Sequence, residues 1–246
     1  MEILAAHGFT GTGSDFEPLV KTIKASWLTP DLPGHATAAH LDCSIHSMVQ
    51  FIDIQARKLE GQSNILCGYS MGARAALLHA LRQPTKWRAL ILISVNPGIR
   101  DEDSRNTRRR EDHELAKKIE REGAQSFLKY WQSTPMIRTQ SSIPSQSLRK
   151  MQENRKNHTA IGLSNSLRQF GQGSFPDLWD QLNTLTMPIL CLSGANDIKY
   201  TSIATQISRQ VDSAQSICIE AAGHMPHLEN TLDSAVAINS FLRQLH

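Results

Sequence analysis

The most informative run of the sequence is Ile65-Leu66-Cys67-Gly68-Tyr69-Ser70-Met71-Gly72-Ala73-Arg74. An apolar run typical of a buried strand leads into a glycine-serine-glycine motif, and a helical pattern over 73–81 follows directly. This order is typical of a nucleophile elbow, in which glycines permit a sharp turn that lifts Ser70 above the sheet. The Met71 amide then lies at a helix N-terminus, where unpaired N–H groups and the helix dipole favour negative charge. We interpret Ser70 as a catalytic residue and the Met71 amide as a donor to an oxyanion.

A catalytic serine needs a base, and the base needs a group that orients it. Asp197 lies just past a strand-like run at 188–193, and His224 lies at the equivalent place after the run at 216–220. Because the carboxyl ends of parallel strands meet at one edge of a sheet, we predict that Ser70, Asp197 and His224 lie together.

Other residues compete for these roles. His227 follows His224 by three residues, but Gly223 frees the backbone directly before His224, so we favour His224. Asp177 and Asp180 precede the fifth predicted strand and are weaker alternatives to Asp197.

The second oxyanion donor should come from the loop after the first predicted strand, which reads Ala6-His7-Gly8-Phe9-Thr10-Gly11-Thr12-Gly13. We expect the donor to be the amide of Phe9. Gly11-x-Gly13 could instead indicate phosphate or dinucleotide binding, but the full G-x-G-x-x-G pattern is absent.

Short apolar runs alternate with helical patterns along the chain, which is typical of βαβ units and a parallel sheet. The predicted strands cover 3–7, 26–29, 64–67, 89–95, 188–193 and 216–220. The predicted helices between them cover 15–24, 44–59, 71–82, 201–211 and 231–245. The fold class is therefore α/β, with a mostly parallel sheet of about six strands flanked by helices.

The alternation stops between residues 98 and 188, where the only patterns are helical, at 111–121, 125–131, 147–156 and 161–170. A structureless loop of this length is improbable in a compact domain, so we interpret residues 100–179 as a helical cap. Residues 1–99 and 180–246 then form the core.

Composition bounds the class of protein. The chain has 246 residues, of which 40% are hydrophobic and 20% charged. It is therefore too apolar for disorder, and large enough to bury a core without stabilising disulfides or metals. No stretch is long and apolar enough for a membrane span, and Met1-Glu2 begins no signal peptide. The four cysteines have no metal-like spacing and are expected to be buried, reduced thiols. We expect a soluble, cytoplasmic protein without a metal.

Charge is distributed unevenly. Residues 100–170 hold 15 Lys and Arg against 9 Asp and Glu, although the whole chain carries only +3. This asymmetry suggests an anionic partner for the cap, while a solvated helical surface is the simpler reading.

These motifs resemble the α/β-hydrolase superfamily and, within it, the family of 2-succinyl-6-hydroxy-2,4-cyclohexadiene-1-carboxylate synthases, lyases of menaquinone and phylloquinone biosynthesis. The resemblance spans the whole chain. Beyond the elbow and the histidine, it rests on Asp31-Leu-Pro-Gly-His35, Asn96-Pro-Gly98, 108–112, Ser166-Leu-Arg-Gln-Phe-Gly-Gln-Gly173 and Pro176-Asp-Leu-Trp179. Two features depart from the family: we expect the family's antiparallel N-terminal strands to be missing from this sequence, and Ala73 stands where the family usually has a glycine.

The resemblance implies a small polycarboxylate substrate that loses pyruvate after a proton is abstracted, with no cofactor. It implies that Ser70, His224 and Asp197 act as a base, and that Arg74, Arg108 and Arg155 bind carboxylates. Tyr69 and Trp131 are expected to be neighbouring pocket residues. Arginine suits this task because its planar fork binds carboxylates bidentately and keeps its charge.

Two of these assignments have alternatives at the level of the sequence. Arg108-Arg109-Arg110 could be a solvated basic face, with the register among the three open, and Trp131 could be a core aromatic of the cap.

Three other functions compete with the lyase. A carboxylesterase or C–C hydrolase has the same elbow, but an esterase for neutral esters gains nothing from burying three guanidinium groups. A non-catalytic binding protein has no need of the intact triad. Nucleic-acid binding is the weakest, because acids interleave with the cap's basic residues and no stacking array is evident. We expect a monomer or weak homo-oligomer.

Overall fold

Six strands form one parallel sheet in the computed structural model, which describes residues 1–61 and 64–245. The strands are β1 (Glu2–Ala6), β2 (Ser26–Leu28), β3 (Asn64–Tyr69), β4 (Ala89–Ile93), β5 (Ile189–Gly194) and β6 (Ala214–Ile219). Their order across the sheet is β2-β1-β3-β4-β5-β6, and every neighbouring pair is parallel. The six predicted strands are confirmed, with ends that differ by a few residues.

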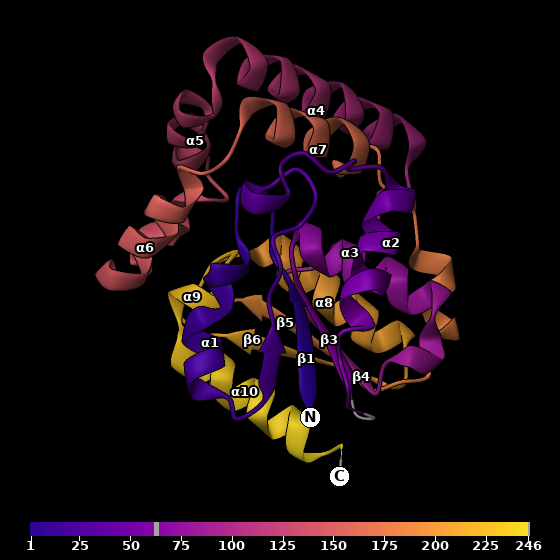
Figure 1. Cartoon of the computed structure of the whole chain (residues 1–246). Coiled ribbons are helices and arrows are strands. Elements are labelled where there is room, and N and C mark those ends of the chain that lie inside the picture. Colours follow the sequence, from indigo (N-terminus) through magenta and orange to yellow (C-terminus); the bar gives the residue numbers. More distant parts are fainter. Residues whose placement is uncertain (62–63, 246) are drawn as a thin grey trace.

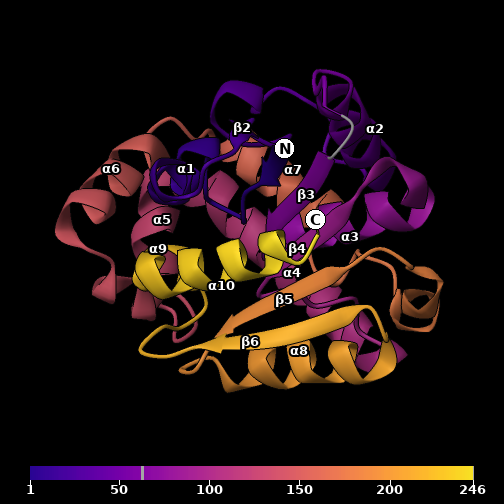
Figure 2. The same ribbon diagram turned by 90° about the horizontal axis from the view of Figure 1, so that it is seen from below.

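Helices cover both faces of the sheet, which explains why the central strands are continuous apolar runs. The helices of the core are α1 (Glu17–Thr22), α2 (Ile45–Ala56), α3 (Met71–Arg82), α8 (Ile198–Gln210), α9 (Pro226–Glu229) and α10 (Thr231–Arg243). Alternate side chains face opposite layers: Leu66 and Leu90 pack with α2, α3 and α8, whereas Ile65 and Ile91 pack with α1 and α10. Figure 2 shows α8 and α10 on opposite sides of β5 and β6.

Four helices fill the predicted cap segment: α4 (Glu102–Glu122), α5 (Ala124–Ser133), α6 (Ser145–Arg155) and α7 (Ala160–Phe170). In Figure 1, α4 and α7 lie side by side above the carboxyl ends of the strands, and α6 projects to one side. Ile119, Phe127 and Leu163 belong to a small core of the cap's own. Helix α4 begins nine residues before the predicted start at 111, because Asp101 caps its N-terminus and its first turns are too polar to show an apolar stripe.

The carboxyl ends of the strands, which the candidate residues follow, face the cap segment. Only Ser70 separates β3 from α3, and Asp197 is the N-cap of α8, just after β5. His224 follows β6, and the loop of residues 7–13 follows β1.

The four cysteines differ in their exposure. Cys218 is exposed, not buried as expected, because β6 is an edge strand and its alternate side chains face solvent, whereas Cys43, Cys67 and Cys191 are buried free thiols. Within residues 1–61 and 64–245, no helix is long and apolar enough to cross a membrane.

Candidate active site

Ser70 occupies a strained turn between strand and helix. Its φ is +50°, in the left-handed region that few non-glycine residues adopt, and its amide donates to the Ile93 carbonyl over 2.8 Å. A Cβ at Gly72 would lie 2.0 Å from the carbonyl oxygen of Ala6, so only glycine lets α3 approach β1 this closely. The glycines of the motif are therefore needed for this turn.

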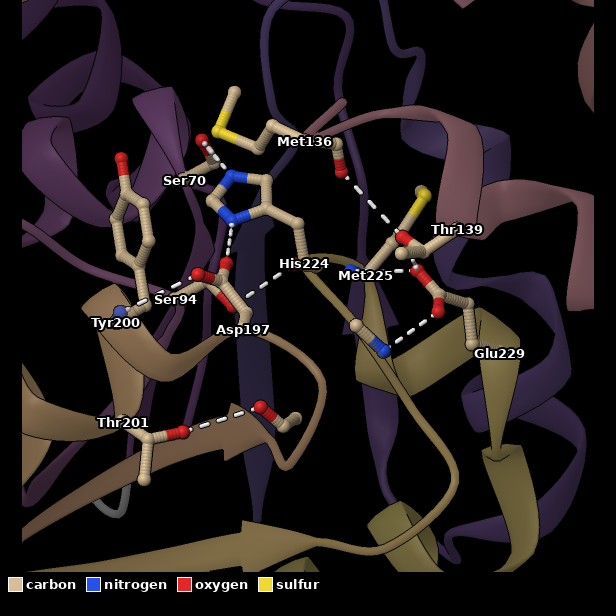
Figure 3. Close-up of polar contacts among 12 residues, drawn as sticks. Ser70, Ser94, Met136, Thr139, Asp197, Tyr200, Thr201, His224, Met225 and Glu229 are labelled. Carbon is tan, nitrogen blue, oxygen red and sulfur yellow. Dashed lines mark hydrogen bonds and ion pairs between the residues drawn. The ribbon is translucent and has the colours of Figure 1, made fainter. Parts of the chain in front are cut away.

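The structure brings Ser70, His224 and Asp197 into one hydrogen-bonded chain (Figure 3). Nε2 of His224 lies 3.0 Å from Oγ of Ser70, and Nδ1 of His224 lies 2.6 Å from Oδ2 of Asp197. The other carboxylate oxygen of Asp197 accepts the amide of Tyr200, so capping of α8 fixes the aspartate's orientation. His224 is buried, while Ser70 is partly exposed.

The competing residues lie elsewhere. His227 is fully buried between Phe16 and Tyr69, with ring centroids 5.2 and 4.7 Å away, and burial lowers its pKa to about 3. Asp177 accepts the amide of Trp179, and Asp180 pairs with Arg100 at the surface. The geometry favours His224 and Asp197.

Three residues that the sequence did not indicate surround the histidine in Figure 3. Ser94 donates to the carbonyl oxygen of His224 over 2.8 Å, and Glu229 accepts the amides on either side of it. The ring of Tyr200 meets the imidazole edge to face, with centroids 4.4 Å apart. No local pattern predicts these contacts, although Tyr200 follows Asp197 closely enough to be suspected once Asp197 is placed.

The loop after β1 is held from several sides. The amide of Thr10 donates to Nε2 of His35 over 3.2 Å. The carbonyl oxygen of Thr10 accepts from Nε of Arg155 (3.1 Å) and from Nε2 of His158 (2.9 Å), both in the cap. Neither Phe9 nor Met71 donates its amide to an acceptor within the described ranges, as an oxyanion site requires.

Arg74 is buried at the junction of core and cap. Its guanidinium donates to the side chain of Gln172 over 2.8 Å and to the carbonyl oxygen of Phe170 over 2.7 Å. It also faces the rings of Phe170 and Phe175. Burial lowers its pKa to about 10, which leaves it charged at neutral pH.

Among the three consecutive arginines of α4, Arg108 is the one whose charge reaches Arg74 and lowers that residue's pKa. Arg108 itself forms an ion pair of 2.8 Å with the buried Asp112. Arg109 instead donates to the carbonyl oxygen of Gly173, and Arg110 donates to Thr107 on the exposed side. Of the three arginines, Arg108 is therefore the one whose charge acts on Arg74.

The two aromatic candidates have different surroundings. Trp131 stacks on Phe127 and meets Phe9 edge to face, with ring centroids 5.7 and 5.5 Å away. It therefore joins the aromatic cluster of the cap to the loop of residues 7–13. Tyr69 is buried beneath Gly8 and contacts the ring of His224, and its burial raises the pKa of its hydroxyl. No group of three or more His, Cys, Asp or Glu residues with metal-site geometry occurs in the part of the chain that the structure describes.

The chain is similar to several known proteins. Residues 3–237 match the Alpha/beta hydrolase family. The 2-succinyl-6-hydroxy-2,4-cyclohexadiene-1-carboxylate synthase of Serratia proteamaculans is 28% identical over 245 residues, which cover 96% of this chain and 91% of the relative. The enzyme of the same name from Photorhabdus laumondii is 27% identical over 241 residues, covering 96% of this chain and 83% of the relative.

A solved structure is also similar. The structure of MenH from S. aureus aligns with a TM-score of 0.90 at 26% identity, over 100% of this chain and 94% of that one. The family match covers both halves of the core and the segment between them, and Ser70, Asp197 and His224 follow strands in the family's chain order. The chain belongs to the alpha/beta hydrolase family.

Proposed function

We propose that this protein is a 2-succinyl-6-hydroxy-2,4-cyclohexadiene-1-carboxylate synthase of menaquinone or phylloquinone biosynthesis. As a carbon–oxygen lyase, it eliminates pyruvate from a succinylated enolpyruvyl-cyclohexene dicarboxylate. The similarity to enzymes of that name supports this choice.

One observation about the site carries the proposal. Nε of Arg74 and Nη1 of Arg155 are both buried and have no hydrogen-bond acceptor within the described residues. A buried, charged N–H without an acceptor is costly, and a substrate carboxylate is an acceptor of the right charge. Arg74 lies one helical turn after Ser70, and Arg155 is bonded to the loop that carries Phe9. Each arginine is therefore attached to an element of the proposed site.

The triad acts as a base in this proposal. Asp197 accepts a hydrogen bond from the Nδ1–H group of His224, which leaves Nε2 free to accept the hydroxyl proton of Ser70. The Ser70–His224 pair then removes a proton from a ring carbon of the substrate. The electron pair forms a ring double bond and expels the enolpyruvyl oxygen as the enolate of pyruvate, which takes up a proton.

Binding and charge stabilisation use the remaining candidates. Arg74, Arg108 and Arg155 hold the substrate carboxylates, while Tyr69 and Trp131 line the pocket. The amides of Phe9 and Met71 stabilise the anion that develops as the proton leaves. No step calls for a cofactor.

We also propose a division into a core (1–99 and 180–246) and a cap (100–179); residues 62, 63 and 246 of these ranges lie outside the described part. The partner is a small polycarboxylate, not a nucleic acid or a membrane, and the protein acts as a monomer or weak homo-oligomer. A cytoplasmic location is supported by four cysteines that are all free thiols.

A carboxylesterase or C–C hydrolase is the second candidate, because the hydrogen bond from Ser70 to His224 suits acyl transfer equally well. A non-catalytic binding role leaves the complete hydrogen-bonded chain unexplained.

The test is incubation with the enolpyruvyl-bearing acid and, as control, the acid that lacks the enolpyruvyl group. We expect stoichiometric pyruvate from the first only, and none with Ser70→Ala. Wild-type protein that releases no pyruvate would overturn the proposal.

A further inference from the structure

Glu229 is a buried carboxylate that the mechanism above does not use. It ends α9, five residues after His224, and its side chain is 8% exposed. Its oxygens accept the amide of Gly223 over 2.6 Å and the amide of Met225 over 3.0 Å. Together with the bond from Ser94 to the His224 carbonyl, these contacts fix the backbone on both sides of the imidazole.

The same carboxylate also binds the cap. Thr139, in the 3-10 turn Arg138–Ser142 between α5 and α6, donates to Oε1 of Glu229 over 3.1 Å. The hydroxyl of Ser142, at the end of that turn, lies 3.4 Å from Oε2 and donates over the shorter distance of 2.8 Å to the carbonyl oxygen of Thr139. Figure 3 shows Glu229 between Thr139 on one side and the peptide at Met225 on the other.

The cap turn Arg138–Ser142 and the loop of residues 220–225, which carries His224 and which we call the histidine loop, are also in direct contact. A Cβ at Gly223 would lie 2.4 Å from Oγ1 of Thr139, so the backbone before His224 leaves just enough space for that hydroxyl. Gln140, in the same turn, donates to the sulfur of Met225 and accepts from Nη2 of Arg155. The turn therefore contacts a proposed carboxylate ligand and the loop of the proposed base.

The chemistry of these partners calls for a carboxylate. Its three closest partners, the amides of Gly223 and Met225 and the hydroxyl of Thr139, all donate hydrogen bonds, and within residues 1–61 and 64–245 no Lys, Arg or His lies within ion-pair distance of Glu229. Glutamine would turn an N–H group toward at least one donor, so it cannot replace the carboxylate here.

We propose that Glu229 is a positioning residue that makes the placement of His224 depend on docking of the Arg138–Ser142 turn of the cap. The inference rests on the proposed function for the role of His224. The carboxylate accepts hydrogen bonds from both the cap and the loop that carries His224. Without the cap's hydroxyls the carboxylate is held less firmly, so it also holds the loop amides less firmly, while the triad residues themselves are unchanged.

The test removes the cap side of the contact. Thr139→Val combined with Ser142→Ala deletes both hydroxyls; valine has the shape of threonine, and alanine lacks only the oxygen of serine. Ser133→Ala is the matched control, because its hydroxyl lies on the same cap and bonds only the carbonyl oxygen of Tyr130. Thr139→Ser restores the hydroxyl and serves as the rescue variant.

Hydrogen exchange of a peptide spanning residues 222–226 reports directly on the loop. In the double variant we expect exchange to be about tenfold faster than in wild type, because the shared carboxylate holds the amides less firmly. Ser133→Ala and Thr139→Ser should exchange like wild type. Unchanged exchange in the double variant overturns the proposal.

The kinetic readout separates positioning from binding. We expect kcat for pyruvate release to fall about tenfold in the double variant with KM changed less than about twofold, since a displaced base slows chemistry. In a Glu229→Gln background, the same pair of substitutions should lower kcat by less than about threefold, because the shared partner is gone. If the pair of substitutions lowers kcat by the same factor in both backgrounds, or changes only KM, Glu229 does not couple the cap turn to His224. If wild type releases no pyruvate, the proposed function fails, and the exchange result still decides whether the cap holds the loop.

Discussion

Nε of Arg155 donates to the carbonyl oxygen of Thr10, 3.1 Å away, and so ties cap helix α6 to the loop that carries the Phe9 amide. The same guanidinium keeps one buried N–H, at Nη1, without an acceptor inside the described residues. A carboxylate bound at Nη1 would therefore contact the side chain that also holds the loop of Phe9. If the proposed function holds, substrate binding at Arg155 and the position of the Phe9 amide are linked.

The two buried arginines should consequently behave differently when removed. Arg74→Ala should lower kcat/KM for the polycarboxylate by roughly 2–4 kcal/mol of transition-state stabilisation, and affect a neutral p-nitrophenyl ester much less. Arg155→Ala should impair both substrates, because it also releases the Thr10 loop. Steady-state kinetics on the two substrates checks this. Equal losses for Arg74→Ala on both would assign it a structural role.

The triad substitutions should be severe and non-additive. Ser70→Ala, Asp197→Asn and His224→Ala should each lower turnover by about three orders of magnitude or more, with circular dichroism unchanged, and the triple variant should lose little beyond the worst single one.

His227→Phe is the matched control, because both ring nitrogens of His227 are buried without partners among the described residues. It should retain turnover within about threefold and gain stability through loss of an unsatisfied polar group. Inactivity of a folded His227→Phe protein would return His227 to consideration as the base.

The elements that the sequence predicted well are local ones. The elbow at Ser70 and the polar residues after β5 and β6 are each defined by neighbours in the chain, so pattern and position sufficed. Glu229 could not be recognised in this way, because its bond to Thr139 spans 90 residues and depends on how the cap docks. The start of α4 was missed because helix formation there relies on a cap at Asp101 and polar helix formers, without an apolar stripe.

Acid should destabilise the protein through its buried histidines. His158 accepts the amide of Ala36 at Nδ1 and donates to Thr10 from Nε2, so it is bonded as the neutral ring, and burial lowers its pKa to about 4. The unfolded chain, with a histidine pKa of about 6.5, binds more protons between those values, so stability falls as pH drops below about 6.5. Burial raises the pKa of Asp15 to about 6, and uptake of a proton there offsets part of the loss.

Urea unfolding at pH 7 and pH 5 measures this effect. His158→Gln can keep both hydrogen bonds without titrating, so its loss of unfolding free energy between the two pH values should be smaller than that of wild type by roughly 2 kcal/mol. The same pH dependence in both proteins would show that His158 does not titrate on unfolding.

The neighbouring small residues of the elbow should differ sharply in tolerance. Gly72→Ala places a methyl group against backbone oxygens of Ala6 and His7 that cannot move aside, and should cost more than about 3 kcal/mol or prevent folding. Ala73→Gly should fold and keep its activity, losing about 1–2 kcal/mol from lower helix propensity and from the loss of a buried methyl group. Thermal unfolding of both variants checks the pair, and a stable Gly72→Ala protein would contradict the described elbow.

In the proposed mechanism, Ser70 and His224 remove a proton and form no acyl-enzyme. Intact-mass spectrometry of protein quenched during turnover of the enolpyruvyl-bearing acid distinguishes this from hydrolysis, with pyruvate measured in the same samples. We predict pyruvate without a burst and unmodified protein at every time point, because elimination makes no bond to Ser70. An adduct on Ser70 that forms and decays at the rate of turnover would contradict the lyase mechanism and indicate a hydrolase.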